Sequence, residues 1–425
     1  MFENSGLSMD QAPPIVVVLR FFLTGSIFGI VAGFMLFFYG ANIANFSSPQ
    51  ALALTHSLTL GVMASFMFGA LYQMLPVLCG VAIKKPDIAA LRVNYALIFG
   101  TIFLIISFFA PSTTLYLFAA LLLGYAIFTT AYVMIKELIN ISHSSSSRGM
   151  LLSLISLIFV GLLGILLLSI RDGLDLSIDY LAIKNAHFSF GLFGWIALLI
   201  ISISFQVIEM FYVTPPYNKI YAKYMPVLII SLLFINLFSA IFMPSMLSII
   251  EYIVILLVAL HASLTLLKLK QKKRAVTDAT VLFWAFGMSS YILFSIAVIL
   301  NLLVSIPAAL IVTLFASFAL SAVFAMSYKI VPFLVWFHLN AKGYFEAPMM
   351  HEIAHPKYAR VNLYFFISSI ASLLLANYVA IFWQIGSIFL TISFSMLFTM
   401  LYKAIKKYFH ILNNGKRFEF NMPNI

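Results

Sequence analysis

Apolar runs of about twenty residues recur from one end of the chain to the other, and each is long enough to cross a hydrocarbon core of about 30 Å as a helix. Because that core holds no water, a spanning segment must satisfy its own backbone hydrogen bonds, which favours helices over strands. With 63% hydrophobic and only 9% charged residues, the 425-residue chain is unlike any water-soluble domain. We therefore expect an all-α integral membrane protein.

The runs predict twelve transmembrane helices within a single transmembrane domain, residues 1–425. The first ten residues lack a basic region followed by a small-residue cleavage site, so no removable signal peptide is expected. The predicted spans are 15–39, 55–82, 93–110, 113–136, 150–170, 186–213, 225–245, 248–267, 279–302, 306–336, 361–381 and 384–405.

Basic residues gather in alternate loops, and this pattern predicts the orientation of the chain. Lys84, Lys85 and the run 268–274 follow even-numbered spans, whereas loops after odd-numbered spans are short and carry little more than Arg171 and Lys184. Because cytoplasmic loops are enriched in Lys and Arg, both termini are expected on the cytoplasmic side of the membrane. The membrane is expected to be a bacterial inner membrane, and residues 406–425 are expected to form a cytoplasmic tail. The net charge of +11 then indicates topology and contact with anionic lipid, and no nucleic-acid partner is expected.

Spans two and six share a pattern of residues that indicates an internal repeat. Span two contains His56 and Gly61 and ends near the sequence YQMLP, whose glutamine is Gln73. Span six contains His187 and Gly194 and ends near FQVIE, whose glutamine is Gln206. In both spans the glycine precedes the glutamine by the same twelve positions. Every fourth span therefore carries related residues.

Span ten extends the pattern, since Ser317 lies twelve positions before Lys329 in the sequence YKIVP. The pattern has a simpler explanation too, because an aromatic residue beside a polar one near a proline marks the ends of many membrane helices. The repeat interpretation predicts three four-helix units, about 15–136, 150–267 and 279–405, arranged as arcs around a common axis. His56 and His187 would then face one shared cavity near the outer face.

Three segments carry a resemblance to a known family: THSLTLGVMASFMFGALYQMLPV, AHFSFGLFGWIALLIISISFQVIEMFYVTPPY and YKIVPFLVWFHL. Together with three arcs of four helices and histidines near the outer ends of spans two and six, they resemble subunit I of the haem–copper oxidases and the related NnrS family. The resemblance spans most of the chain. It implies a twelve-helix fold in three arcs, haem or copper bound by His56 and His187, and a role in respiration-linked metal handling or nitrosative stress.

The chain also departs from the oxidase pattern. Span seven has no histidine, although an oxidase holds copper with a histidine pair there, and span ten has none before His338 at its cytoplasmic end. Iron and copper centres need imidazoles from several directions. A complete oxygen- or nitric-oxide-reducing centre is therefore not expected, and no catalytic residue is assigned.

Other ionisable residues within the spans are candidates for function, because they are costly in lipid. His261 in span eight could complete a site with His56 and His187, or pack as a satisfied neutral histidine. Glu209 and Lys329 occupy equivalent repeats and could pair or, with Gln73 and Gln206, form a proton or ion path. In the alternative interpretation, Glu209 is solvated near the headgroups and the Lys329 side chain snorkels to them.

Residues 351–355 read His-Glu-Ile-Ala-His, which matches the H-E-x-x-H pattern of zinc hydrolases. The segment falls in a cytoplasmic loop, and Pro356 follows the second histidine directly, both of which argue against a zinc site. Three functions stay open from sequence: a haem–copper-oxidase-like protein, a secondary transporter of a small solute or metal ion, and a membrane zinc protease. The absorption spectrum and metal content would separate the first two.

Overall fold

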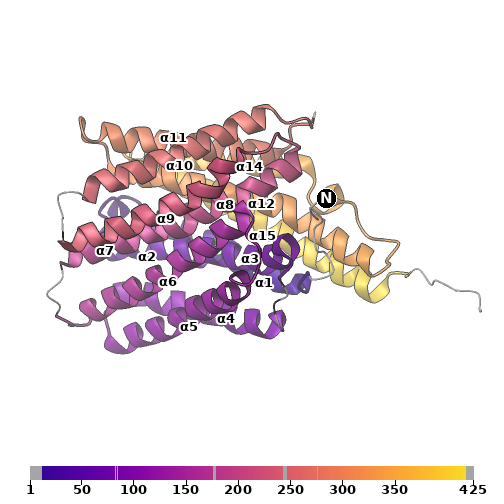
Figure 1. Ribbon diagram of the computed structural model, residues 1–425, viewed down its shortest axis with the longest axis horizontal. Coiled ribbons are helices and arrows are strands. Elements are labelled where there is room, and N and C mark those ends of the chain that lie inside the picture. Colours follow the sequence, from indigo (N-terminus) through magenta and orange to yellow (C-terminus); the bar gives the residue numbers. More distant parts are fainter. Residues whose placement is uncertain are drawn as a thin grey trace, which may run out of the picture.

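A computed structural model describes residues 12–81, 83, 85–175, 179–242, 247–274 and 276–417. Within this part of the chain twelve helices are long and apolar enough to cross a membrane, which confirms the predicted number (Figure 1). The first six are α1 (Ile15–Tyr39) with η2 (Gly40–Ala44); α2 (Pro49–His56), η3 (Ser57–Ala64) and α3 (Ser65–Cys79); α4 (Pro86–Phe109); α5 (Thr113–Leu138); α6 (Ser145–Arg171); and α7 (Tyr180–Ser189), η4 (Phe190–Ala197) and α8 (Leu198–Tyr212).

The last six spans are single helices, and a short helix, α13 (Met350–Ile353), connects two of them. No strand is present among the described residues beyond an isolated bridge between Tyr344 and Arg417. The spans are α9 (Lys219–Phe242), α10 (Leu247–Lys270), α11 (Ala279–Leu300), α12 (Ala308–Ala341), α14 (Pro356–Leu375) and α15 (Ile381–Asn414).

Several helices begin earlier than their apolar runs. Spans two and six start at Pro49 and Tyr180, six residues before the predicted 55 and 186. Ser48 and Asp179 cap these starts, and the side chain of each accepts a hydrogen bond from a backbone N–H of the first turn. Because capping satisfies N–H groups that have no partner inside the helix, a helix can begin well before its hydrophobic part.

The C-terminal helix also extends past its predicted end. The sequence analysis ends the last span at 405 and assigns 406–425 to a tail, but α15 continues to Asn414, just before Gly415. The added turns pack on the end of α12, since Tyr408 is buried and the Tyr344 hydroxyl donates to the Leu412 carbonyl at 2.8 Å. Residues 418–425 lie outside the described part of the chain.

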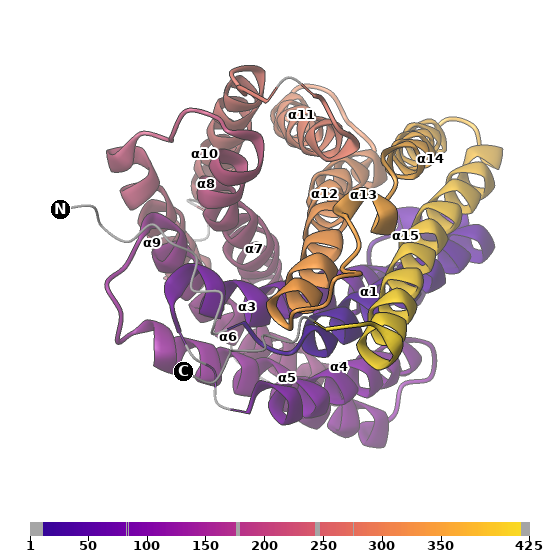
Figure 2. The same cartoon turned by 90° about the vertical axis from the view of Figure 1, so that its right-hand side faces the viewer.

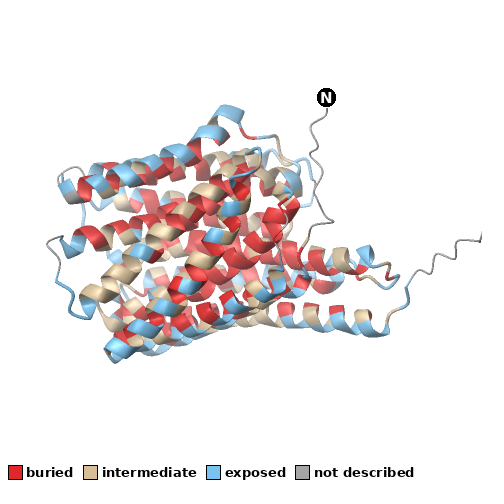
Figure 3. Ribbon diagram, turned by 60° about the horizontal axis from the view of Figure 1, so that its bottom comes forward, coloured by how far each residue is buried: buried red, intermediate tan, exposed pale blue. Residues whose placement is uncertain are grey.

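Spans two and six are the most enclosed of the twelve. In their most apolar windows 83% and 78% of residues are buried, compared with 28% in α6 and 33% in α10. Figure 2 looks along the helices and shows them standing side by side, with the last helix, α15, next to the first, α1. Buried residues gather toward the inside of this bundle and exposed ones on its outward faces (Figure 3).

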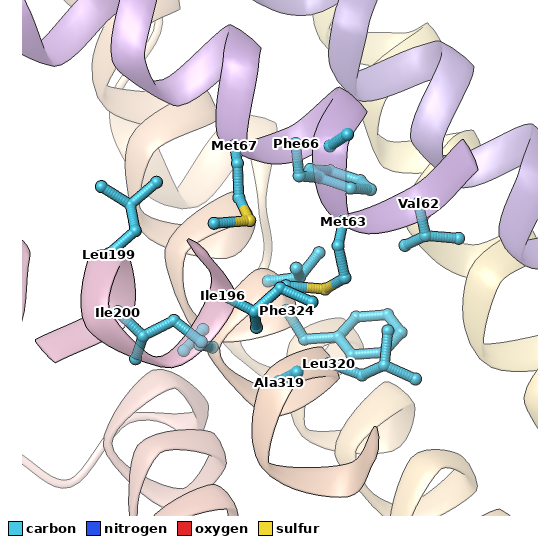
Figure 4. Packing of buried hydrophobic residues seen from close by; sticks show 14 of the residues in the cluster. Val62, Met63, Phe66, Met67, Ile196, Leu199, Ile200, Ala319, Leu320 and Phe324 are labelled. Carbon is cyan, nitrogen blue, oxygen red and sulfur yellow. The ribbon is translucent and has the colours of Figure 1, made fainter. Parts of the chain in front are cut away.

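The centre of the bundle is formed by spans two, six and ten. Figure 4 shows Met63 of η3, Ile196 of η4 and Phe324 of α12 within one apolar cluster, and all three are buried. Because lipid offers no hydrophobic driving force between helices, close packing of this kind holds a membrane bundle together. Related residues on these three spans therefore lie on helices that meet.

Candidate histidine site

The structure brings His56 and His187 together. Each lies seven residues after the start of its span, at Pro49 and Tyr180 respectively, so both are near the same end of the bundle. Their ring centroids are 6.4 Å apart, and the ring planes differ by 23°. Two imidazoles that are 131 positions apart in the sequence therefore lie close together, on the two spans that the repeat pattern relates.

Hydrogen bonds fix the protonation of both rings. His56 Nδ1 lies 2.8 Å from the carbonyl oxygen of Leu52, and His187 Nδ1 lies 3.1 Å from that of Val160. A carbonyl only accepts, so each Nδ1 donates, and in the neutral ring each Nε2 then presents a lone pair. Neither Nε2 has a hydrogen-bond partner among the residues that the structure describes. This is the arrangement in which a histidine binds a metal through Nε2 while its other nitrogen holds the ring in place.

A π-helix follows each histidine. The turns η3 and η4 are both eight residues long, and their fifth residues are Gly61 and Gly194. The glycines allow close contact with the preceding span, since a Cβ on Gly61 would overlap the Phe28 ring and one on Gly194 would lie 2.6 Å from Ser156 Oγ. Because π-turns are rare and occur often at functional sites, finding two at equivalent places supports a common role for spans two and six.

Aromatic and basic side chains surround the pair. The Phe108 ring lies 5.2 Å from the His56 ring, and the Arg171 guanidinium lies 5.5 Å from the Phe108 centroid. Arg171 Nε also donates to the Tyr116 hydroxyl at 3.1 Å. On the other side Gly164 leaves room for the His187 ring, whose Cε1 would be only 3.2 Å from a Cβ there. The imidazoles are thus held by packing as well as by hydrogen bonds.

His261 does not join this pair. Its Nε2 lies 2.8 Å from Ser204 Oγ and 3.2 Å from Thr265 Oγ1, and its Nδ1 lies 3.0 Å from the Tyr221 hydroxyl. Ser204 follows His187 by 17 residues on one continuous span, a rise of about 25 Å at ~1.5 Å per residue. Both ring nitrogens are therefore occupied far from His187, and the structure contradicts a shared site in favour of the satisfied packing role.

Glu209 and Lys329 also have separate partners, so the predicted pairing between them is wrong. Glu209 Oε1 accepts the backbone N–H of Tyr217 at 2.7 Å. Lys329 Nζ instead contacts Asp278 Oδ2 at 3.1 Å, and its ammonium lies over the ring of Tyr212. Asp278 caps α11, a role that sequence analysis did not assign to it.

The two glutamines of the repeat make no contact with these charges. Gln73 is buried, and its Oε1 has no hydrogen-bond partner among the described residues, whereas Gln206 is half-buried. No hydrogen bond within that part of the chain joins either amide to Glu209 or Lys329. A proton or ion path through these four residues stays a prediction.

Glu251, a carboxylic acid inside span eight, is a candidate that was not predicted from the sequence. Its Oε1 accepts from Ser189 Oγ at 3.1 Å and from Asn236 Nδ2 at 3.4 Å. Ser189 lies two residues after His187, so the carboxyl is near the same end of the bundle. The signal was available, since Glu251 is the only acidic residue of an otherwise apolar run, and ionisable residues at such places tend to be functional.

The segment 351–355 does not have the geometry of a zinc hydrolase. That motif needs both histidines on one face of one helix, but α13 ends at Ile353. His355 instead caps α14, its Nδ1 accepting the backbone N–H of Lys357 at 3.2 Å. Glu352 is exposed and forms an ion pair with Lys407 at 2.9 Å, which lowers the pKa of its carboxyl.

Across the described residues no group of three or more His, Cys, Asp or Glu side chains is placed to hold a metal ion. The candidate site is therefore a pair of imidazoles, with no third ligand of these types at hand. No protein-family model matches the chain, and no curated protein is significantly similar to it.

Proposed function

We propose that His56 and His187 bind a single copper ion through their Nε2 atoms, and that the protein handles this metal at the outer face of a bacterial inner membrane. The observation that carries the proposal is the matched state of the two rings. Each Nδ1 donates to a backbone carbonyl, each Nε2 lacks a partner among the described residues, and the centroids are 6.4 Å apart.

The separation of the rings suits one metal ion. A metal–nitrogen bond of about 2.0 Å on each side, together with the radius of each ring, puts two ligating imidazoles about 6 Å apart between centroids. The observed 6.4 Å needs only a small adjustment. Imidazole suits copper, iron and zinc, but a structural zinc ion takes four protein ligands and Cu(I) is satisfied by two. The donor set therefore fits copper best.

The proposal includes an oxidase-like architecture of three arcs around a common axis, with both termini in the cytoplasm. Its support is the central packing of spans two, six and ten and the equivalent π-turns η3 and η4. Copper bound at the pair would supply a redox-active ion or be the cargo itself. The chain's own residues orient the imidazoles, through the Leu52 and Val160 carbonyls, and shield one face of His56 with Phe108.

The test is copper binding by the purified protein, measured by metal analysis and by titration of Cu(I) against a competing chelator. We expect one copper per chain in the natural protein and none in His56→Ala or His187→Ala. His410→Ala is the control, because His410 is exposed near the opposite end of the bundle. Retention of one equivalent by both site variants would overturn the proposal. A Soret band that disappears in the same variants would assign the pair to haem iron instead.

A second candidate function, secondary transport of a metal ion, is favoured by Glu251. Within the described residues its carboxyl has hydrogen bonds from neutral groups only, Ser189 and Asn236, and no ion pair. A carboxyl of that kind inside a spanning helix is typical of sites that exchange protons with a substrate. Copper uptake into vesicles driven by a pH gradient, and lost in Glu251→Gln, would support transport; equal uptake by this variant would exclude the role of Glu251.

A further inference from the structure

A groove lies at the end of the bundle opposite the histidine pair, where α1, α4 and α15 meet. It is a cavity of about 340 Å³ in the outward surface, with walls that are mostly apolar. Two tyrosines, Tyr95 and Tyr408, contribute to its lining. Its volume is within the range of about 300–1,000 Å³ that is usual for sites that bind small molecules.

The polar lining of this groove includes one cation without an anion. Arg20 is the sixth residue of α1, and its Nη1 is buried without a hydrogen-bond partner in the described chain. It forms no ion pair with a described residue. The neighbouring polar groups satisfy each other, since Asn94 Nδ2 donates to Thr24 Oγ1 at 3.1 Å. A guanidinium nitrogen that is buried without a partner is costly, and an anion in the groove would satisfy it.

We propose that this groove binds an anionic phospholipid, with the phosphate on Arg20 and the upper acyl chains along Leu23 and Ile27. A guanidinium matches phosphate through paired N–H donors, which an ammonium cannot reproduce. The apolar walls select an anion that carries hydrocarbon, because a free phosphate ion would gain nothing from them. The bilayer supplies such molecules directly to a groove on the outward surface.

Charge near the groove agrees with this occupant. Lys342 Nζ donates to the Tyr408 hydroxyl at 3.1 Å and so brings a second cation to the rim. Several other basic residues lie on the same end of the bundle, and clusters of this kind attract anionic headgroups. They include Lys403, Lys406 and Lys407.

The test is lipid retention by the purified protein, counted by native mass spectrometry after exposure to phosphatidylglycerol, phosphatidylcholine or inorganic phosphate. We expect one tightly held phosphatidylglycerol per chain and about tenfold weaker retention in Arg20→Gln, because a charge-assisted hydrogen bond is lost. Arg92→Gln removes the same charge from an exposed position on α4 and should retain the lipid. Arg20→Lys should be intermediate.

Size-exclusion chromatography would show whether Arg20→Gln folds. If it does not, a second variant, at Ile27, tests the proposal. Ile27 lines the groove and is 49% exposed, so Ile27→Trp should fill the apolar wall without disturbing the bundle. It should reduce phosphatidylglycerol retention while Arg20 stays in place. Equal retention of phosphatidylcholine, equal losses in Arg20→Gln and Arg92→Gln, or displacement of the lipid by an equal concentration of inorganic phosphate would each overturn the proposal.

Discussion

Removing either member of the Lys329–Asp278 pair should destabilise the protein, and removing the aspartate should cost more. The side chains are 14% and 24% exposed, and the ammonium and carboxylate are 3.1 Å apart. At an effective dielectric constant of about 20 this separation corresponds to an attraction of about 5 kcal/mol before desolvation is subtracted. Partly buried pairs retain a fraction of that, so we expect a coupling free energy of about 2–3 kcal/mol.

The asymmetry follows from the other contacts of each group. Asp278 Oδ1 keeps the hydrogen bonds from Thr280 N, Thr280 Oγ1 and Val281 N when the lysine is gone. Among the described residues Lys329 has no second anion, and it keeps the nearby rings of Phe211 and Tyr212. Lys329→Met should therefore cost about 1.5–3 kcal/mol, the value of a charge-assisted hydrogen bond. Asp278→Asn retains the helix cap but leaves a buried ammonium, at about 3–5 kcal/mol.

The assay is unfolding of the protein in mixed micelles by titration with SDS, applied to both single variants and to the double variant. The double variant should be more stable than Asp278→Asn alone, because it no longer buries an unpaired charge. A coupling free energy below about 0.5 kcal/mol, the level of an exposed pair, would refute the reasoning. So would a larger loss in Lys329→Met than in Asp278→Asn.

The same pair predicts the sign of a pH dependence. Burial alone would raise the pKa of Asp278, but the Thr280 hydrogen bond and the Lys329 charge outweigh it and lower the pKa. A carboxyl with a lowered folded pKa stabilises fully above its unfolded value of about 3.9, and this contribution is lost as the pH falls through the folded pKa. Asp278→Asn should remove that part of the acid sensitivity, while a matched variant at the exposed Asp87 should not.

Three further outcomes are expected. Gly194→Ala should lower the free energy of unfolding by about 1–3 kcal/mol and reduce copper occupancy, because the added Cβ would lie 2.6 Å from Ser156 Oγ. Gly191→Ala in the same π-turn should be tolerated, since its Cβ would meet nothing closer than 3.9 Å. Equal effects of the two variants would contradict the role of η4. Glu251 should react with a hydrophobic carbodiimide, and the label, detected by peptide mass mapping, should be absent in Glu251→Gln; an unlabelled Glu251 in the natural protein would contradict this. Glu352→Gln should leave zinc content and the unfolding midpoint unchanged, because the side chain is exposed; bound zinc that disappears in the variant would revive the hydrolase interpretation.

Hydropathy and charge were sufficient to predict the number of spans, because each helix needs its own apolar run in lipid. They predicted helix starts less well. The helix starts at Pro49 and Tyr180 are capped by Ser48 and Asp179, and a hydropathy window does not detect such capping bonds. The end at Asn414 depends on packing against α12, which no local signal encodes.

The candidate site was predicted from an internal repeat. Such a repeat predicts where a side chain lies in the bundle better than it predicts which residue that side chain contacts. Placing His56 and His187 on equivalent spans was enough to bring their rings together. The same reasoning predicted a pair between Glu209 and Lys329, and this prediction was wrong. Lys329 instead forms an ion pair with Asp278, which lies in a loop without a counterpart in the repeat pattern. The carbonyl acceptors of the two Nδ1 atoms belong to the backbone and could not be identified from residue types.

Span ten, in the proposed third repeat, adds no imidazole to the pair. The first turns of α12, residues 308–317, contain no histidine, and its backbone is a continuous α-helix without a π-turn. Phe315 packs instead against Phe193 of η4, with ring centroids 6.0 Å apart. Span ten thus contributes apolar surface where the first two repeats contribute imidazoles. Because the proposed metal ion would have only two imidazoles here, the pair would favour an ion that tolerates low coordination, and such an ion would be easier to pass on than one enclosed by four ligands.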